Sequence, residues 1–329
     1  MPRSPRSRHG RHSRRTTTGN RWRDLLSRQP RYGLALGACL ALLASGVVVG
    51  VLGGEDRPAA ERAVPEDGPV EAHRAPGDSG SGAAGSPPDD AEPVEKLDDH
   101  PLLADPDIGL PNRKCELPGW QSTPEAAEEF FRAATECLNA AWEPVLRAHD
   151  LPFESPSLVF PDSSRFTSEC GQVTVNVETA AYYCKGEIFL PFEGLQTQQY
   201  GDQAGVYLAL LGHEYGHHVQ ELAGIMDAVW DEIYTVGVHS EAGQEMSRRK
   251  ELQAQCFSGM FLGSHVELGS VSRDMYEQAW ADQETRGDDT SGGRDHGSNE
   301  NYATWWRDGA QHNSIAGCNT FTASSEAVS

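Results

Sequence analysis

The sequence predicts an α+β domain, and three observations support this fold class. A helical pattern covers residues 124–148, short β-branched or alternating runs lie between residues 157 and 191, and helical patterns return after residue 202. Because the strand-like runs form one block between helices, this order favours α+β over alternating α/β. We expect the folded domain to cover residues 113–323, followed by a short tail at residues 324–329.

The N-terminal region predicts a membrane anchor. Residues 1–31 contain ten arginines and one acidic residue, and residues 32–54 form an uncharged run. A run of this length can cross a hydrocarbon core of roughly 30 Å, and arginine collects on the cytoplasmic side of membranes. We therefore predict a basic cytoplasmic tail, one transmembrane helix at the cell membrane and a domain outside the cytoplasm. A cleaved signal peptide is the weaker alternative, because its apolar region is usually shorter.

Residues 55–112 are rich in Pro, Gly, Ala, Ser, Asp and Glu, and this composition predicts a disordered linker. Beyond residue 31 the chain holds 17 basic and 48 acidic residues, within an overall formal charge of −22. Since phosphate binding needs a basic face, this acidic body argues against nucleic acid as a partner. The sequence does not indicate an oligomeric state.

The elements of the domain follow from local patterns. The first helix has Ser122 or Thr123 as its cap, Pro124 in its first turn and apolar residues at helical spacing. The runs SLVF, GQVTVNV and GEIFLP are bounded by Pro, Gly and Ser and predict strands. Helical spacing then predicts further helices over residues 202–223, over residues 241–263, and from residue 270 or 272 to residue 286.

Six cysteines lie beyond the predicted membrane segment. An even number of cysteines in a translocated domain suggests disulfides, although six cysteines allow fifteen connectivities. Pairing neighbours along the chain gives Cys115 with Cys137, Cys170 with Cys184, and Cys256 with Cys318. No CxxC spacing is present, so a metal site built from these thiols is disfavoured.

An HExxH motif lies in the predicted helix over residues 202–223. Residues four apart share a helix face, so His213 and His217 can present their imidazoles to one metal ion. In such motifs zinc lowers the pKa of a water molecule to about 7, and the glutamate, here Glu214, accepts the proton. The alternative is a chance HExxH on an ordinary exposed helix.

A zinc site of this kind needs a third protein ligand. The metzincin extension is absent, because Gln220 and Ala223 stand where its glycine and last histidine belong. The downstream carboxylates are Glu221, Asp227, Asp231, Glu232, Glu241, Glu245 and Glu251. Glu221 would have to bend back along its own helix. We favour Glu251, because it lies in a run of good helix formers whose apolar residues can pack against the first helix.

Several segments together resemble a known family. HEYGHHVQELAGI, ELQAQCFSGMF, HGSNENYATWW and CNTF, with the upstream CGQVTVNVETAAYYCKGEIFLPFE, look like consecutive blocks of the putative neutral zinc metallopeptidase family, a group of bacterial membrane-tethered or secreted proteins. The resemblance covers residues 113–321. It implies a zincin-like domain with an HExxH helix, a small β-sheet and a second ligand-bearing helix. It also implies one Zn²⁺ ion bound by His213, His217 and Glu251, with Glu214 as general base.

Two further positions follow from this resemblance. The family has an HGS segment late in the chain, and His296 there is predicted to donate a hydrogen bond to the oxyanion that forms during peptide hydrolysis. Gln255 stands where the family has aspartate, a residue of the kind that accepts the free N–H of a ligating histidine. Glutamine still accepts but brings no charge, so we expect a weaker site.

We predict structural rather than chemical roles for three other residues near the motifs. His218 points about 100° away from His217 on the helix, so we expect it on the surface or behind the ligands. Trp305 and Trp306 are interpreted as core residues rather than a substrate platform.

Two functional hypotheses remain. The first is a membrane-anchored zinc endopeptidase or aminopeptidase that acts on peptide or protein substrates outside the cytoplasm. The second is a catalytically weakened or inactive zincin-like extracellular binding protein, and Gln255 is the residue that favours it.

Overall fold

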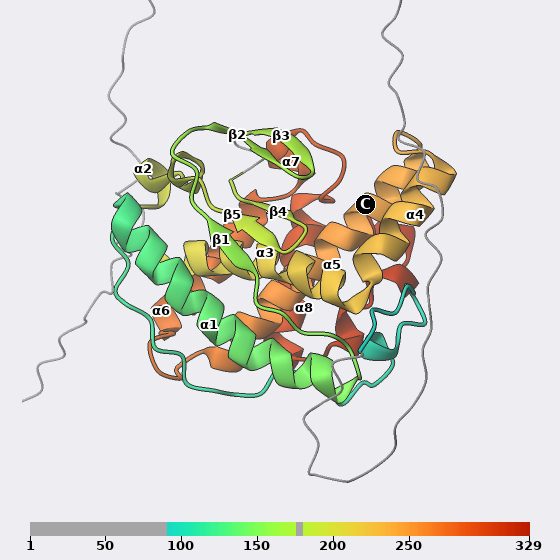
Figure 1. Cartoon of the computed structure of the whole chain (residues 1–329), viewed down its shortest axis with the longest axis horizontal. Helices are drawn as coiled ribbons and strands as arrows, with labels where there is room; N and C mark the ends of the chain where they lie inside the picture. The colour runs from blue at the N-terminus through green and yellow to red at the C-terminus, as the bar shows by residue number, and fades with distance from the viewer. Residues whose placement is uncertain (1–90, 176–179) are drawn as a thin grey trace, which may run out of the picture. The chain divides into compact units, whose positions relative to one another are not determined.

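The structure is a computed structural model that describes residues 91–175 and 180–329 (Figure 1). The predicted basic tail, the predicted transmembrane helix and residues 55–90 of the predicted linker lie outside the described residues. Within the described part of the chain, no helix combines the length and the apolar character that crossing a membrane requires.

The described domain is α+β, as predicted, and helices make up most of its secondary structure. They are α1 (Pro124–Ala148), α2 (Thr197–Tyr200), α3 (Ala204–Ala223), α4 (Ile225–Val236), α5 (Glu241–His265), α6 (Arg273–Asp282), α7 (Asp288–Ser291) and α8 (Asn299–His312). The prediction for α1 is confirmed, and its cap is Thr123, whose side chain accepts from the N–H of Ala126. The helices predicted from residues 202, 241 and 270 or 272 correspond to α3, α5 and α6. The sequence reading did not predict α2, α4, α7 or α8.

Two small sheets complete the α+β architecture. The strands are β1 (Ser157–Val159), β2 (Arg165–Ser168), β3 (Gly171–Thr174), β4 (Tyr182–Cys184) and β5 (Glu187–Phe189). In the first sheet β5 lies between β1, its parallel neighbour, and β4, its antiparallel neighbour. β2 and β3 form an antiparallel hairpin. The three predicted runs contain β1, β3 and β5, whereas β2 and β4 were not predicted.

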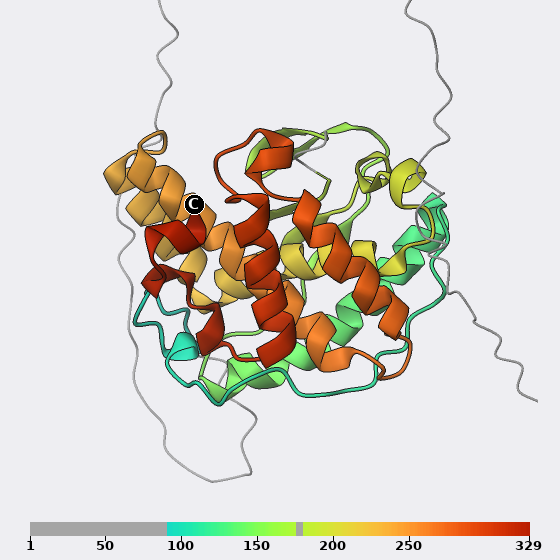
Figure 2. The ribbon, with the colours of Figure 1, turned by 180° about the vertical axis from the view of Figure 1, so that it is seen from behind.

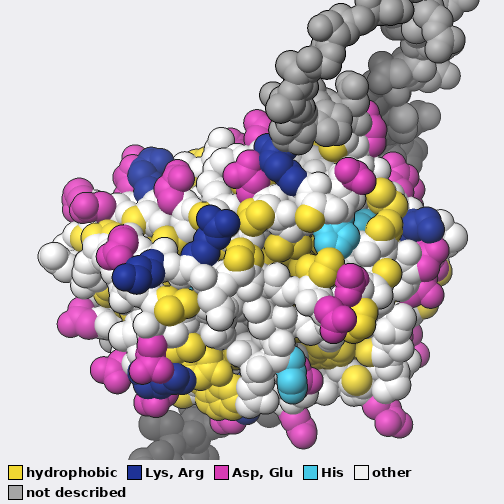
Figure 3. All heavy atoms as spheres, turned by 90° about the horizontal axis from the view of Figure 1, so that it is seen from below, with side chains coloured by type: hydrophobic (Ala, Val, Ile, Leu, Met, Phe, Trp, Pro, Cys, Tyr) yellow, Lys and Arg dark blue, Asp and Glu magenta, His cyan; other side chains and the backbone are white. Residues whose placement is uncertain are grey.

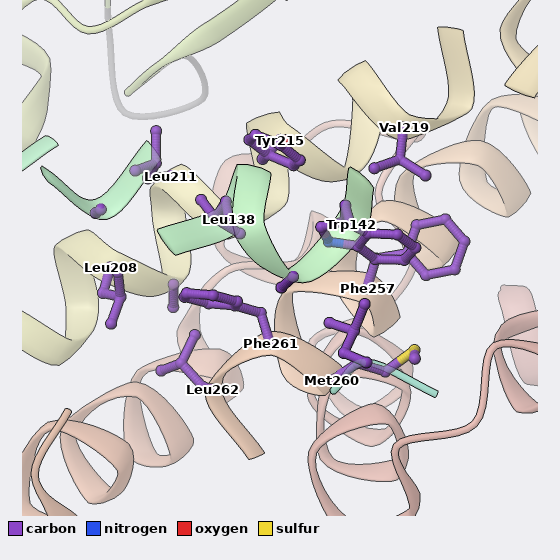
Figure 4. Close-up of a cluster of buried hydrophobic side chains, with 14 of the residues drawn as sticks. Leu138, Trp142, Leu208, Leu211, Tyr215, Val219, Phe257, Met260, Phe261 and Leu262 are labelled. Atoms are coloured by element: carbon purple, nitrogen blue, oxygen red, sulfur yellow. The ribbon is translucent and has the colours of Figure 1, made fainter. Parts of the chain in front are cut away.

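The core lies where α3 and α5 pack against each other, with α1 on one side and α8 on the other (Figures 1 and 2). Figure 4 shows side chains from α1, α3 and α5 meeting in this core. They include Leu138, Trp142, Leu208, Tyr215, Phe257 and Phe261, each at most 1% exposed. Burial of each such apolar side chain stabilises the fold by about 1.5–3 kcal/mol. This core fixes α3 against α5, the two helices that carry the HExxH motif and Glu251.

Two glycines allow the central helices to approach closely. A Cβ on Gly216 of α3 would lie 2.7 Å from the carbonyl oxygen of Ala254 in α5. A Cβ on Gly259 of α5 would overlap the carbonyl oxygen of Trp306 in α8. Because neither glycine has a side chain, the backbones of α3, α5 and α8 lie nearly in contact. Trp306 itself is fully buried, as predicted, and Trp305 is partly buried beside the core.

The linker prediction is wrong for residues 91–112. Leu102, Leu103 and Leu110 are buried in the core. The ring of buried His100 donates from Nε2 to the carbonyl oxygen of Ala223, at 2.9 Å, and accepts from the N–H of Leu102 at Nδ1. Average composition predicted disorder because these few apolar residues are diluted among polar ones, yet each has a place in the core.

The tail prediction for residues 324–329 is also corrected. Ser325–Val328 form a short 3₁₀ helix, and the side chain of Val328 is fully buried against Leu252 and Tyr302. Arg248 donates from Nε to the carbonyl oxygen of Val328 at 2.8 Å. One buried valine and its backbone hydrogen bonds are enough to dock this end, and composition does not reveal them.

The six cysteines form the three pairs proposed from their order in the sequence. Cys115 is bonded to Cys137, Cys170 to Cys184, and Cys256 to Cys318. The first pair joins the segment before α1 to α1, the second joins the β2–β3 hairpin to β4, and the third joins α5 to the C-terminal segment. A disulfide that closes a loop of about 15 residues stabilises a fold by roughly 3 kcal/mol.

The surface agrees with the acidic composition. On the face drawn in Figure 3, acidic side chains are spread over the surface, and basic side chains stand singly or in small groups among them. Hydrophobic side chains form small patches between them on that face.

Candidate metal centre

A cleft of about 830 Å³ lies beside the HExxH helix. Its walls come from β4, α3, α4, α5, the segment around residues 282–296 and the start of α8. The predicted site residues all line this cleft: His213, Glu214, His217, Glu251, Gln255 and His296. The fold therefore brings together residues that are up to 83 positions apart in the sequence.

Two histidines and one carboxylate converge on a single point in the cleft. The Nε2 atom of His213 lies 3.2 Å from Oε2 of Glu251, and the Nε2 atom of His217 lies 2.9 Å from the same oxygen. The three side chains are 8%, 8% and 10% exposed. The other carboxylate oxygen of Glu251 pairs with Nζ of Lys250 at 2.7 Å. One oxygen of Glu251 is thus held by Lys250, and the other faces both imidazoles.

A chain of amide hydrogen bonds determines where His213 carries its proton. Gln283 donates from Nε2 to the carbonyl oxygen of Ala279, so its own Oε1 is turned toward Gln255. Gln255 donates to that oxygen, and its Oε1 lies 3.0 Å from Nδ1 of His213. Because an amide oxygen only accepts, Nδ1 of His213 carries the proton, and Nε2 of the neutral ring is unprotonated.

His217 is oriented in the same way by Gln220. The Nε2 atom of Gln220 donates to the carbonyl oxygen of Lys250 at 2.9 Å and to Oε1 of Gln253 at 3.0 Å. Its Oε1 therefore faces Nδ1 of His217, at 2.9 Å, and accepts the proton there. The Nε2 lone pair of the neutral ring points toward Glu251.

This donor set fits zinc. The Nε2 atoms of His213 and His217 both face one carboxylate oxygen of Glu251 in a buried place. His213, Glu251 and His296 also form a group whose ligand atoms all lie within 4.8 Å of one another. Two donors that each lie about 2.0–2.1 Å from a tetrahedral zinc ion are roughly 3.3 Å apart. The separations of 3.2 Å and 2.9 Å from Glu251 are close to that value. A cation would therefore satisfy lone pairs that otherwise repel one another.

Glu214 lies next to this point and is buried. Burial raises the pKa of its carboxyl group to about 7, although His213 opposes the rise. Among the described residues, none donates a hydrogen bond to its side chain. A buried carboxyl group that faces the cleft and titrates near neutral pH suits a general base.

His296 approaches the same point from the loop before α8. Its Nε2 lies 3.5 Å from Oε2 of Glu251, and its Nδ1 lies 2.8 Å from Oδ1 of Asp295. Burial lowers the pKa of His296, but Glu251 and Asp295 together outweigh burial and raise it to about 9. The backbone N–H of His296 and that of Gly297 donate to Asp288, which fixes the loop. His296 can thus serve as a proton donor beside the site or as a further ligand.

The sequence reading missed several residues that shape the site. Gln220 lies one turn after His217, and this spacing could have indicated it. Tyr302 is buried, and its ring centroid lies 6.1 Å from that of His213. Its segment, NENYATWW, was quoted as part of the family resemblance, but no role was predicted for Tyr302. Lys250 and Gln283 gave no signal, because their contacts depend on the packing of α5 with its neighbours.

The surface interpretation of His218 is wrong. The residue is 2% exposed, its Nε2 donates to the carbonyl oxygen of Glu154 at 2.8 Å, and its Nδ1 contacts the hydroxyl group of Tyr183. Burial lowers the pKa of His218 to about 4. His218 therefore ties α3 to the segment after α1 and, through Tyr183, to β4, and it does not itself line the cleft.

Comparison with known proteins supports the chemical interpretation. The sequence profile described as "Putative neutral zinc metallopeptidase" matches residues 117–321. The uncharacterized protein YpfJ of Escherichia coli K12 is 34% identical over 131 residues, which cover 37% of this chain and 44% of the E. coli protein. The uncharacterized protein Rv2575 of Mycobacterium tuberculosis is 27% identical over 215 residues, which cover 58% of this chain and 69% of that protein. The matched region thus spans less than half of the E. coli relative, and no solved structure matches the chain.

Proposed function

The chain belongs to the putative neutral zinc metallopeptidase family, and from this premise we propose that it is a zinc-dependent peptidase that hydrolyses peptide bonds in a peptide or protein substrate. The observation that carries the proposal is the convergence of His213 Nε2 and His217 Nε2 on Oε2 of Glu251 inside a cleft. We assign these three residues as the ligands of one Zn²⁺ ion.

The neighbouring side chains have distinct roles in this proposal. Zinc bound there supplies Lewis acidity, which lowers the pKa of a water molecule to about 7 and polarises a carbonyl group. Glu214 accepts the proton of the attacking water and later delivers it to the leaving amine. His296 donates a hydrogen bond from Nε2 to the carbonyl oxygen of the scissile bond as negative charge develops there. Gln220 and Gln255 hold the two imidazoles in the tautomer that binds a metal.

We further propose that the domain works outside the cytoplasm, anchored by the uncharged run at residues 32–54. The three disulfides support this location, because disulfides persist in oxidising compartments. The arginines before the run support an N-terminus in the cytoplasm.

A second candidate function is a weakened or inactive relative that binds peptides without cleaving them. The observation that favours it is Gln255, a neutral acceptor for the Nδ1 proton of His213. A carboxylate in that place makes the imidazole a stronger donor, and loss of such partners typically weakens metal affinity or activity about 10- to 100-fold.

Zinc analysis and a matched pair of variants test the proposal. The full chain, purified in detergent, is expected to hold one equivalent of zinc and to cleave casein or a peptide library. Glu214→Gln should keep the zinc but lose roughly 10²–10⁴-fold in kcat/KM, because general-base catalysis typically contributes that much. Glu221→Gln, at another acidic residue that α3 places in the same cleft, should cleave like the parent. Undiminished cleavage by Glu214→Gln would refute the mechanism, and zinc binding without cleavage by the parent would favour the second candidate.

A further inference from the structure

Two aromatic side chains of α4 are exposed on the wall of the candidate active-site cleft. Trp230 is 37% exposed and Tyr234 is 68% exposed, and both line the cleft that contains His213. Their rings are stacked with centroids 5.8 Å apart. Together with Val238, they are the large hydrophobic residues that the described chain leaves exposed.

The exposure of these rings does not come from a loosely attached helix. The opposite face of α4 is buried in the core through Ile225, Val229 and Ile233, each fully buried. α4 also packs along α5, the helix that carries Glu251. The two rings therefore form a fixed apolar surface on a rigid element.

Lys250 connects this surface to the metal centre. Its Nζ lies 5.3 Å from the ring centroid of Trp230 and 2.7 Å from Oε1 of Glu251. These two distances place the ring centroid within about 8 Å of the Glu251 carboxylate. An extended peptide advances roughly 3.3 Å per residue, so the ring is within about two or three residues of a bond cleaved at the metal.

We propose that Trp230 and Tyr234 form a subsite that binds an aromatic or large apolar side chain of the substrate, near the scissile bond. This inference rests on the proposed peptidase function and adds the substrate class to it. Aromatic rings bind such side chains through apolar burial and ring stacking. Asp227 of α4 also lines the cleft, so it disfavours an acidic substrate side chain beside Trp230.

The position of the occupant also follows from the structure. The surface is continuous with the cleft around His213 and Glu251, whereas Val238, the other exposed hydrophobic residue, does not line that cleft. A peptide bound across the metal centre would therefore cover Trp230 and Tyr234 and leave Val238 exposed. This difference makes Val238 the matched control.

The test uses the full chain and alanine-based peptides in which one phenylalanine or one aspartate is moved through each position. With the parent, phenylalanine at one position near the cleaved bond should raise kcat/KM roughly tenfold over alanine, as burial of an aromatic side chain predicts. Trp230→Ala should abolish that preference, so the variant should cleave the phenylalanine and the all-alanine peptides with similar kcat/KM. Trp230→Phe should retain most of the preference, and Val238→Ala should retain all of it. If Trp230→Ala lowered kcat/KM equally for all peptides, or for none of them, the proposed subsite would be refuted.

Binding measurements separate this inference from the proposed catalytic function. Fluorescence anisotropy with labelled peptides and the Glu214→Gln variant reports binding without cleavage. A phenylalanine preference that disappears in Glu214→Gln/Trp230→Ala supports the subsite even if the parent cleaves nothing. Absence of any phenylalanine preference overturns the subsite whether or not the parent cleaves. Sedimentation of the parent and of Trp230→Ala is the last measurement. If the variant formed smaller particles than the parent, the two rings would join copies of the chain, and the inference would be refuted.

Discussion

At the scale of single residues, the orientation of the two histidines depends on uncharged amides. Gln255 and Gln220 each accept an Nδ1 proton, and their own amide groups are held by further hydrogen bonds. Uncharged acceptors fix the tautomer but donate little electron density to the imidazole. The site is therefore ordered for metal binding, although each ligand is a weaker donor than it would be beside a carboxylate.

Replacing Gln255 by alanine is expected to weaken zinc binding. Without its Oε1, the Nδ1 proton of His213 loses its acceptor, so zinc affinity should fall about 10- to 100-fold. Competition with a chromophoric chelator measures this affinity directly. Gln199→Ala changes an exposed glutamine that does not line the cleft and should bind zinc like the parent. Equal affinities for Gln255→Ala and the parent would show that the amide network does not tune the site.

Replacing His296 by alanine distinguishes its two possible roles. As the donor to the developing oxyanion, its loss should lower kcat roughly 10²–10³-fold while one equivalent of zinc stays bound. As a further ligand, its loss should instead reduce the zinc affinity together with activity, since its Nε2 lies 3.5 Å from Oε2 of Glu251. Zinc titration and kcat measured on the same preparation separate the two, and a fall in zinc affinity would contradict the assigned role.

At the scale of elements, the C-terminal 3₁₀ helix supports the loop that carries His296. The backbone N–H of Ser298 donates to the carbonyl oxygen of Ser329 at 2.9 Å, and Arg248 bridges Val328 and Arg294 through their carbonyl oxygens. Val328 also packs against Tyr302, whose ring lies near those of His213 and His296. A short segment far from the motif in sequence thus helps to position the site.

Truncating Val328 should therefore affect both stability and catalysis. Val328→Ala removes buried methyl groups and should cost about 1–3 kcal/mol of unfolding free energy. For a domain of 150–250 residues this lowers Tm by about 2–12 °C. Calorimetry and kcat/KM on the same variant test the expectation, with Glu326→Ala, an exposed neighbour, as the control. A melting temperature equal to that of the parent would mean that this helix is not docked in solution.

Some helices and strands were predicted from the sequence and others were not, and the difference has physical reasons. α1 was predicted because its amphipathic pattern and N-cap are local signals, and α5 because its residues have helical spacing and include good helix formers. α4 was missed because only Gly224, at φ +85°, separates it from α3, and the sharp turn there leaves little trace in the pattern. The start of α8 has a helix signal in the sequence, because Ser298 is a good N-cap residue and its side chain caps the helix. These residues were used only for the family resemblance, and no helix was predicted there. β4 was missed because its three residues include no β-branched side chain, whereas β1 contains Val159 and β5 contains Ile188.

The site was partly predictable for a related reason. His213, Glu214 and His217 follow from spacing within one helix, and Glu251 was indicated by helix-forming neighbours together with family resemblance. The contacts of Lys250, Gln283 and Tyr302 depend on how α5, α6 and α8 pack, and no local pattern in one sequence contains that information.

At the scale of the whole molecule, the segment at residues 91–112, which contains His100, makes the unfolding free energy depend on pH. His100 is fully buried, and it donates to the carbonyl oxygen of Ala223 while accepting from the N–H of Leu102, so only the neutral ring fits. Burial lowers the pKa of His100 below its usual 6.5. Between the folded and the unfolded pKa the unfolded chain binds more protons, so the unfolding free energy decreases as pH falls. The contribution of His100 is therefore complete above about pH 6.5 and is lost as pH falls from there toward the folded pKa.

A comparison of the parent with His100→Gln isolates this contribution. Glutamine can still donate to the carbonyl oxygen of Ala223 but does not titrate, so at pH 7.5 the variant should be less stable by about 1–2 kcal/mol because its fit is poorer. As the pH is lowered to 5 in the presence of EDTA, the parent should lose Tm faster, and the difference between the two proteins should shrink. Contributions from the rest of the chain are common to both proteins and cancel from the difference. Parallel melting curves across this range would mean that the segment around His100 is not docked against the end of α3 in solution.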